Sequence, residues 1–158
     1  MNPFKFLFIL LLVIYGGQAV SQESFFPEAY KVFKYNEGDI LAFQDKDGWS
    51  ITKIIKITKV SLKAGETISI QNKVFTAPID DYLLIIGTSF SKPYKTLDEL
   101  KLAVKNNKWE VQIGHVPRRT PGIGDGSIFI GNQPVSKEEL SGYFQWKSAF
   151  DKGEAGVF

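Results

Sequence analysis

A run of five apolar residues at positions 82–86 (YLLII) places the strongest constraint on how this chain folds. A strand without a polar face is buried on both sides, so we expect this run to form the central strand of a sheet. Other segments also have strand composition, and Asp47-Gly48 between two of them tolerates the backbone angles of a tight hairpin. The predicted strands are residues 30–35, 40–43, 49–60, 67–71, 73–76, 82–86, 108–116 and 128–130.

The long segment 49–60 carries two further signals. Ile54 and Ile55 are adjacent, so they put apolar side chains on both faces, which predicts a bulge at that point. Lysines recur every three residues at positions 53, 56 and 59, and we interpret them as a solvated strand edge.

Two helices are predicted from capping boxes, in which a Ser or Thr and a Glu three residues later satisfy free amide groups at a helix start. Thr96 and Glu99 form the first box, and the helix that follows ends near residues 106–107. Ser136 and Glu139 form the second box. The strands and helices together predict an α+β fold: a strongly bent antiparallel sheet, or a partly closed β-barrel, covered by two α-helices.

The N-terminus has the features of a secretory signal peptide: Lys5, an apolar run at residues 6–15 and a small-residue exit at residues 16–21. The apolar run is shorter than the roughly 20 residues of a membrane-spanning helix. We therefore expect residues 1–21 to be removed, which leaves one domain at residues 22–158. An uncleaved anchor is the alternative. The expected product is a periplasmic or secreted bacterial protein without stable membrane insertion.

Composition excludes several functions. The chain has no cysteine, which rules out disulfides, thiol chemistry and zinc–thiolate sites. Charges nearly balance, with 19 Lys+Arg against 17 Asp+Glu, which predicts no large basic field for nucleic acid or membranes. One histidine and scattered carboxylates predict no metal site, and no motif for a cofactor is present.

Residues 108–127 hold the only histidine, His115, and the only two arginines. Alternation along the predicted strand puts His115 on the same face as Trp109, Val111 and Ile113, and we expect this face to point into the core. Two roles stay open for His115: a structural histidine at the end of a core strand, or the general base of a hydrolase. No catalytic motif such as G-x-S-x-G accompanies it, so no other catalytic residue is predicted.

Arg118 and Arg119 lie in a stretch from Pro117 to Gly126 that we expect to form a loop. Arginine is favoured where a planar, forked donor meets a carboxylate or phosphate, so both are predicted to bind a partner. Pairing with an acid of the same chain, such as Asp125, is the alternative. The hairpin turn is the second predicted binding surface, through Asp45, Asp47 and Trp49.

Two phrases of the sequence resemble immunity proteins of bacterial polymorphic-toxin systems. The first is EGDILAF at residues 37–43, followed by Asp47-Gly48 and KIIKI at residues 53–57, and it is similar to opening strands of an SH3-like barrel. The second is W-x-V-x-I-G-H-V-P at residues 109–117. The resemblance implies a barrel-type sheet and a partner that is a toxin or another enzyme.

The sequence therefore favours an exported protein-binding module, an inhibitor or an immunity-type protein, over an enzyme. An envelope hydrolase centred on His115 is one alternative. A barrel that binds a small apolar ligand is the other.

Overall fold

The computed structural model describes residues 24–158, and the predicted signal peptide at residues 1–21 lies outside them. The described chain is α+β, as the sequence predicts. Its elements in chain order are η1 (Glu28–Tyr30), β1 (Asp39–Asp45), β2 (Gly48–Leu62), β3 (Thr67–Ile70), β4 (Lys73–Thr76), β5 (Asp81–Ser91), α1 (Leu97–Lys105), β6 (Val111–Arg119), β7 (Ile128–Asn132) and α2 (Ser141–Asp151).

Five strands form one antiparallel sheet in the order β6-β5-β2-β1-β7, and β3 and β4 form a separate hairpin. Within the described residues, the edge strands β6 and β7 do not pair with each other, so the sheet is open and not a closed barrel. The apolar run 82–86 lies within β5, an interior strand, while the middle position belongs to β2. β2 is one continuous strand, and a register shift between Ile54 and Lys56 confirms the predicted bulge.

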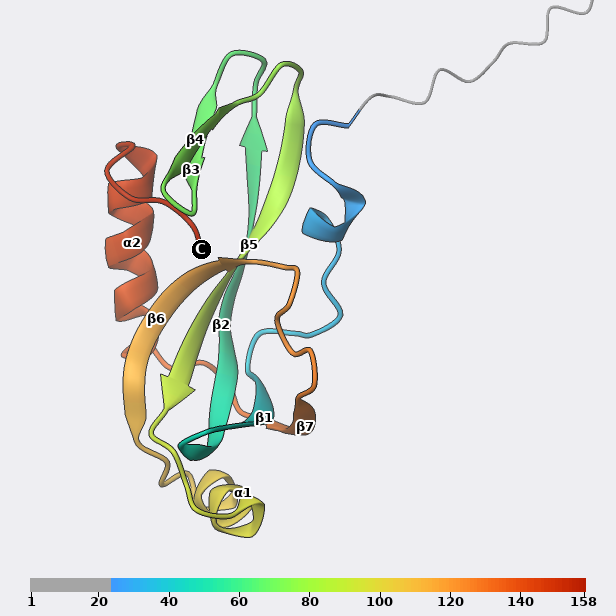
Figure 1. The fold of residues 1–158 in the computed structure, drawn as a ribbon. Helices are drawn as coiled ribbons and strands as arrows, with labels where there is room; N and C mark the ends of the chain where they lie inside the picture. The colour runs from blue at the N-terminus through green and yellow to red at the C-terminus, as the bar shows by residue number, and fades with distance from the viewer. Residues whose placement is uncertain (1–23) are drawn as a thin grey trace, which may run out of the picture.

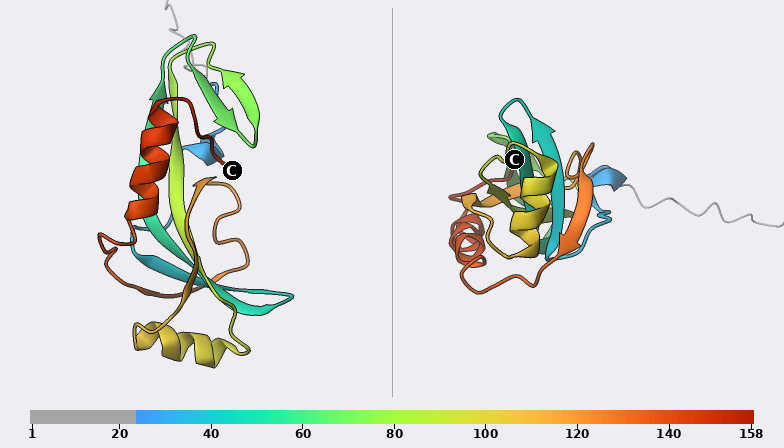
Figure 2. Two further views of the ribbon diagram at one scale, coloured as in Figure 1. Left: turned by 90° about the vertical axis from the view of Figure 1, so that its left-hand side faces the viewer. Right: turned by 90° about the horizontal axis from the view of Figure 1, so that it is seen from below.

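β2 and β5 run through the whole length of the molecule and connect its two ends (Figure 1). The β3–β4 hairpin folds over one end, and α1 lies across the other end (Figure 2). α2 runs beside the sheet, and the C-terminus returns between the hairpin and β6. Its Val157 forms an isolated bridge with Ile70 of the hairpin.

The two faces of the sheet bury different groups of residues. On one face, which we call the helix face, α1 and α2 cover two apolar clusters. On the other, which we call the leader face, Phe33 and Tyr35 of the chain before β1 and Ile123 of the β6–β7 loop cover Leu41, Ile54 and Ile86. Sheets with two covered faces need apolar residues at consecutive positions, which explains the run in β5.

The predicted strand at residues 30–35 is wrong. These residues include the end of η1 and an extended stretch that joins no ladder. β1 already pairs with β2 on one side and β7 on the other. The aromatic residues that suggested a strand instead pack on the sheet as individual side chains.

Both capping boxes form. The Thr96 hydroxyl accepts a hydrogen bond from the Glu99 amide, and the Glu99 carboxylate accepts one from the Thr96 amide. Ser136 and Glu139 make the same reciprocal pair, at 3.2 and 2.8 Å. α2 nevertheless begins only at Ser141, because a turn over residues 137–140 separates the box from the regular helix.

Candidate functional site

One row of directly opposed residues crosses all five strands of the sheet. Its members are Ile113, Phe90, Thr52, Leu41 and Phe129, in the order of the strands from β6 to β7. Directly opposed residues share a face of the sheet. Because Leu41 belongs to the cluster on the leader face, the whole row lies on that face.

The two ends of this row are uncovered. Ile113 is 47% exposed and Phe129 is 55% exposed, while Phe90 is half-buried. Phe43 lies on the same face as Leu41, two residues away on β1, and its ring packs edge-on against Phe90 with centroids 6.2 Å apart. We call Ile113, Phe90, Phe43 and Phe129 the apolar strip. Large apolar side chains gathered on one surface mark an interaction site, unlike scattered single ones.

Arg118 borders the apolar strip. It lies opposite Ile86 on the leader face, and its guanidinium carbon is 5.9 Å from the centroid of the Phe90 ring. Burial lowers the pKa of Arg118 from its usual range, although an arginine stays charged in proteins. Within residues 24–158 no carboxylate forms a salt bridge with Arg118. This cation is therefore partly desolvated beside an aromatic ring and lacks an acidic partner in that range.

Arg119 is used differently, because it is the next residue of β6 and points to the helix face. Its guanidinium donates a hydrogen bond to the Tyr30 hydroxyl and lies 5.3 Å from the centroid of that ring. The expected Pro117–Gly126 loop thus begins later than predicted, since both arginines end a strand. Neither arginine pairs with Asp125, the alternative that the sequence left open.

The predicted residues of the hairpin turn also divide between the faces. Asp45 is exposed, lies two residues beyond Phe43 on the same face, and accepts a hydrogen bond from the Asp47 amide at 2.8 Å. Trp49 packs in the cluster under α1 and exchanges backbone hydrogen bonds of 2.8 and 2.7 Å with Tyr94. The apolar strip thus has Asp45 on the side of the hairpin turn, and Trp49 is part of the core.

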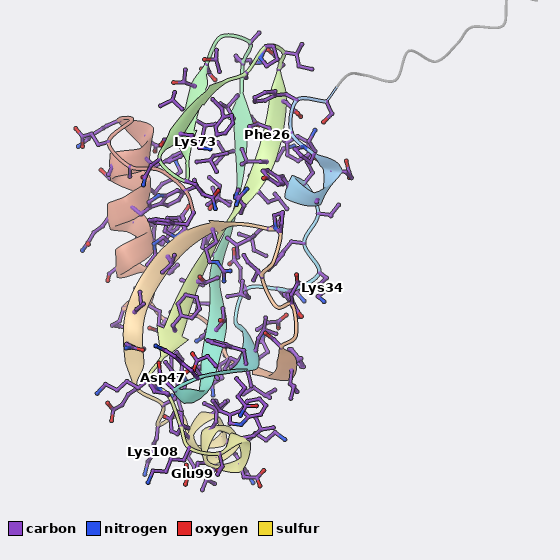
Figure 3. The ribbon with its side chains drawn as sticks, viewed as in Figure 1. Phe26, Lys34, Asp47, Lys73, Glu99 and Lys108 are labelled. Atoms are coloured by element: carbon purple, nitrogen blue, oxygen red, sulfur yellow. The ribbon has the colours of Figure 1, made fainter. Side chains whose placement is uncertain are left out.

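The structure does not bring the two arginines next to the turn. Arg118 lies opposite Ile86, whereas Trp49 lies opposite Tyr94, eight residues farther along the chain. At about 3.3 Å per residue this separation is roughly 25 Å. Figure 3 shows Asp47 at the end of the molecule near α1.

His115 lies on the face opposite Ile113, contrary to the sequence prediction. β6 has an extra residue relative to β5 between Ile113 and Val116, and another between Val111 and Ile113. Each one-residue bulge reverses the alternation of side chains. His115 and Val111 therefore face the helices, while Ile113 points to the leader face and is exposed. A single-sequence pattern could not reveal these bulges.

The imidazole of His115 is enclosed by α2. Its ring centroid lies 5.9 Å from that of Tyr143 and 5.7 Å from that of Trp146. A Cβ atom on Gly87 would lie 2.7 Å from His115 Nε2, so this nitrogen sits directly over the Gly87 backbone. Burial lowers the pKa of His115, which favours the neutral ring. Nε2 is buried and has no hydrogen-bond partner among the described residues.

Two more buried polar groups lie beside His115 on the helix face. Ser89 is 2% exposed, and its hydroxyl has no hydrogen-bond partner in the described part of the chain. Lys53 lies opposite Ser89 and is also 2% exposed, so its predicted place on a solvated edge is wrong. Its ammonium donates to both carboxylate oxygens of Glu139, at 2.7 and 2.9 Å.

This arrangement does not form a preassembled hydrolase site. Ser89 and His115 line one pocket together with Glu138, but neither Ser89 Oγ nor His115 Nε2 bonds to the other. Activation of a serine needs a hydrogen bond to its base and a third group that orients the base. No carboxylate of residues 24–158 hydrogen-bonds to the His115 ring.

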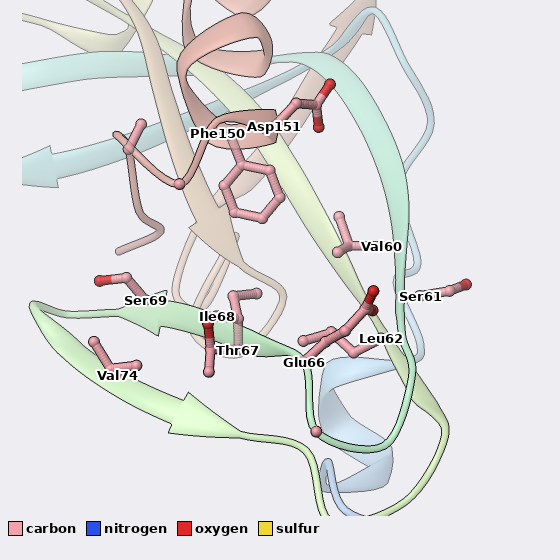
Figure 4. Close-up of a pocket in the computed structure, with 13 residues that line it drawn as sticks. Val60, Ser61, Leu62, Glu66, Thr67, Ile68, Ser69, Val74, Phe150 and Asp151 are labelled. Carbon is pink, nitrogen blue, oxygen red and sulfur yellow. The ribbon is translucent and has the colours of Figure 1, made fainter.

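A further cavity lies at the other end of the molecule, between β2, the hairpin and the end of α2 (Figure 4). It measures about 580 Å³. Its acidic side chains already have partners, because Glu66 accepts from the Lys63 amide and Asp151 pairs with Lys147. The acidic groups in this cavity are therefore satisfied within the fold.

Residues 24–158 contain no cluster of three or more potential metal-ligating side chains. Over the same residues, no helix has the length and apolar character to cross a membrane. Comparison of the chain with known protein families, curated proteins and solved structures finds no match.

Proposed function

We propose that this protein is an exported protein-binding module, of the inhibitor or immunity type, and that it holds another protein against the leader face of its sheet. The proposal rests on the apolar strip. Four large apolar side chains on four strands gather at one surface, and the outer two are about half exposed. Burying such a surface against a partner is favourable in proportion to the apolar area removed from water.

The position of Arg118 supports a protein partner with an acidic group. Its guanidinium lies against Phe90 and has no carboxylate partner within residues 24–158. Aromatic residues and arginine are the types that carry most binding energy in protein interfaces. We infer that the partner offers an apolar segment to the strip and an Asp or Glu to Arg118.

The rigid setting of the strip also fits an inhibitor. Its residues project from paired strands and not from flexible loops, so little conformational entropy is lost when a partner binds. The toxin or enzyme expected from the resemblance to immunity proteins is the partner class that we propose.

Photo-crosslinking in living cells tests this proposal, because it captures whichever protein contacts the modified position. A benzophenone amino acid is placed at Phe129, at Ile113 or at Val74, which is 71% exposed on β4 far from the strip. We expect one defined protein adduct from positions 129 and 113, and none of the same mass from position 74.

The proposal also predicts that Arg118 contributes to binding at this surface. Adding Arg118→Gln to the Phe129 cross-linking variant should reduce the yield of the adduct. Equal adducts from all three positions, or no adduct from the strip, would contradict a binding role for the leader face.

A further inference from the structure

A second, smaller site lies on the helix face, where β6 meets the start of α2. This pocket measures about 290 Å³ and is lined by Ser89, Val111, Gly114, His115, Glu138, Glu139, Ser141 and Gly142. Such a volume is close to the lower limit for pockets that hold small molecules. The site shares no residue with the apolar strip.

The inner wall of the pocket contains a polar group without a partner. Ser89 Oγ is buried and makes no hydrogen bond within the described residues. Buried polar groups in proteins are almost always hydrogen-bonded, and leaving one unsatisfied costs about 1–3 kcal/mol. The unpaired Ser89 hydroxyl at the pocket wall indicates that something else bonds to it.

The start of α2 adds donors at the same place. Among the hydrogen bonds of the described chain, neither the Gly142 amide nor the Tyr143 amide has an acceptor. Free amides and the helix dipole make a helix N-terminus attractive to negative charge. Lys53 and Glu139 neutralise each other nearby, so the fixed charge of that pair does not oppose an anion.

We propose that this pocket binds a small carboxylic acid with an apolar body. The carboxylate accepts hydrogen bonds from the Ser89 hydroxyl and from the Gly142 amide at the start of α2, and the His115 side chain lines the pocket beside them. The apolar body lies toward Val111 at the mouth. Glu138, which also lines the pocket, sets a limit on affinity because its charge repels the same carboxylate.

Heteronuclear NMR tests the site with benzoate as the probe and with benzyl alcohol and benzylamine as neutral and cationic controls. We expect saturable shifts at the amides of Ser89 and Gly142 and at the single imidazole, His115, with benzoate only. Failure of benzoate to give saturable shifts up to on the order of 10 mM, or equal binding of the controls, would overturn the proposal.

Substitutions in the pocket test whether its polar groups bind the carboxylate. Ser89→Ala removes the hydroxyl with little change in volume, and we expect about tenfold weaker binding of benzoate. Glu138→Gln should strengthen binding several-fold by removing the repulsion. Val111→Trp at the exposed mouth should abolish binding, and Val74→Trp on β4 serves as its matched control.

If Ser89→Ala and Glu138→Gln leave the dissociation constant unchanged, the proposed orientation of the carboxylate is wrong. Because the strip lies on the other face, this result does not depend on partner binding. Val111→Trp should therefore leave the Phe129 cross-link intact.

Discussion

Two neighbouring aspartates show how much local environment decides the role of a residue. Asp80 is exposed and pairs with the exposed Lys63. Asp81 has a side chain only 7% exposed and bonds to Lys31 and to the Phe26 amide, which ties the chain before β1 to the start of β5. Burial by itself raises the pKa of Asp81, but the hydrogen bonds from Lys31, Phe26 and Tyr82 outweigh it and lower the pKa well below the usual range.

This difference predicts how stability responds to acid. The pKa of Asp81 is lower in the folded protein than the unfolded value of about 3.9. The contribution of ionised Asp81 to the free energy of unfolding is therefore complete above that pH and is lost as the pH falls. We expect Asp81→Asn to cost about 2–3 kcal/mol of unfolding free energy at pH 7, from urea denaturation. The difference from the wild type should shrink progressively below about pH 5.

Asp80→Asn is the matched control, and it should change stability little, because solvent screens an exposed pair. An Asp81→Asn penalty that stays constant down to about pH 2 would contradict the linkage.

Some residues of the two sites could be predicted from the sequence and others could not, for physical reasons. Arg118 stood out because, apart from its neighbour Arg119, every other cation is lysine, and its place beside the strip is consistent with the binding role predicted for it. The burial of Ser89 and Lys53 could not be predicted, because it depends on the segment from Pro134 to Gly142 that crosses over them. Contacts made so far apart in the chain are not encoded in any local pattern.

Among the elements, turn, bulge and capping signals were reliable, whereas strand offsets and the strand predicted at residues 30–35 were not. The capping boxes, the Asp-Gly hairpin and the bulge at Ile54 all rest on neighbouring residues, and all are present. The two bulges of β6 depend on its pairing with β5, and they separate Ile113 from Val111 and His115, which keep the predicted inward orientation. For the same reason Ile113, expected in the core, became part of an exposed surface.

The connection from β7 to α2 is held to the sheet by one buried ion pair. Glu139 binds Lys53, whose side chain is 3% exposed. Glu139→Ala would leave the Lys53 charge buried without a partner, and we expect a loss of about 3–5 kcal/mol in unfolding free energy. The double variant Lys53→Met/Glu139→Leu should recover most of it, since both charges are then gone.

Urea unfolding followed by tryptophan fluorescence measures both variants. Glu138→Ala, at the adjacent exposed position, is the control and should have little effect. If the double variant is as unstable as Glu139→Ala, the penalty comes from the lost capping box and not from an unpaired charge.

In the whole molecule, the two faces of the sheet differ in what covers them. The helix face carries both helices, most of the core and the small pocket. Among residues 24–158, the cover of the leader face consists of Phe33, Tyr35 and Ile123 over its middle. The α+β class followed from composition and periodicity, whereas the uncovered part of this face follows from strand order and register.

We propose that a partner protein binds this uncovered part. The most direct test uses the partner protein that cross-linking identifies. Its dissociation constant is measured with the wild type, Phe129→Ser, Arg118→Gln and the control Val74→Ser. We predict that each of the first two variants raises the dissociation constant about tenfold or more, because exposed aromatic and arginine contacts dominate such interfaces. The control should bind like the wild type. Unchanged affinity in both strip variants would show that the partner does not bind the apolar strip.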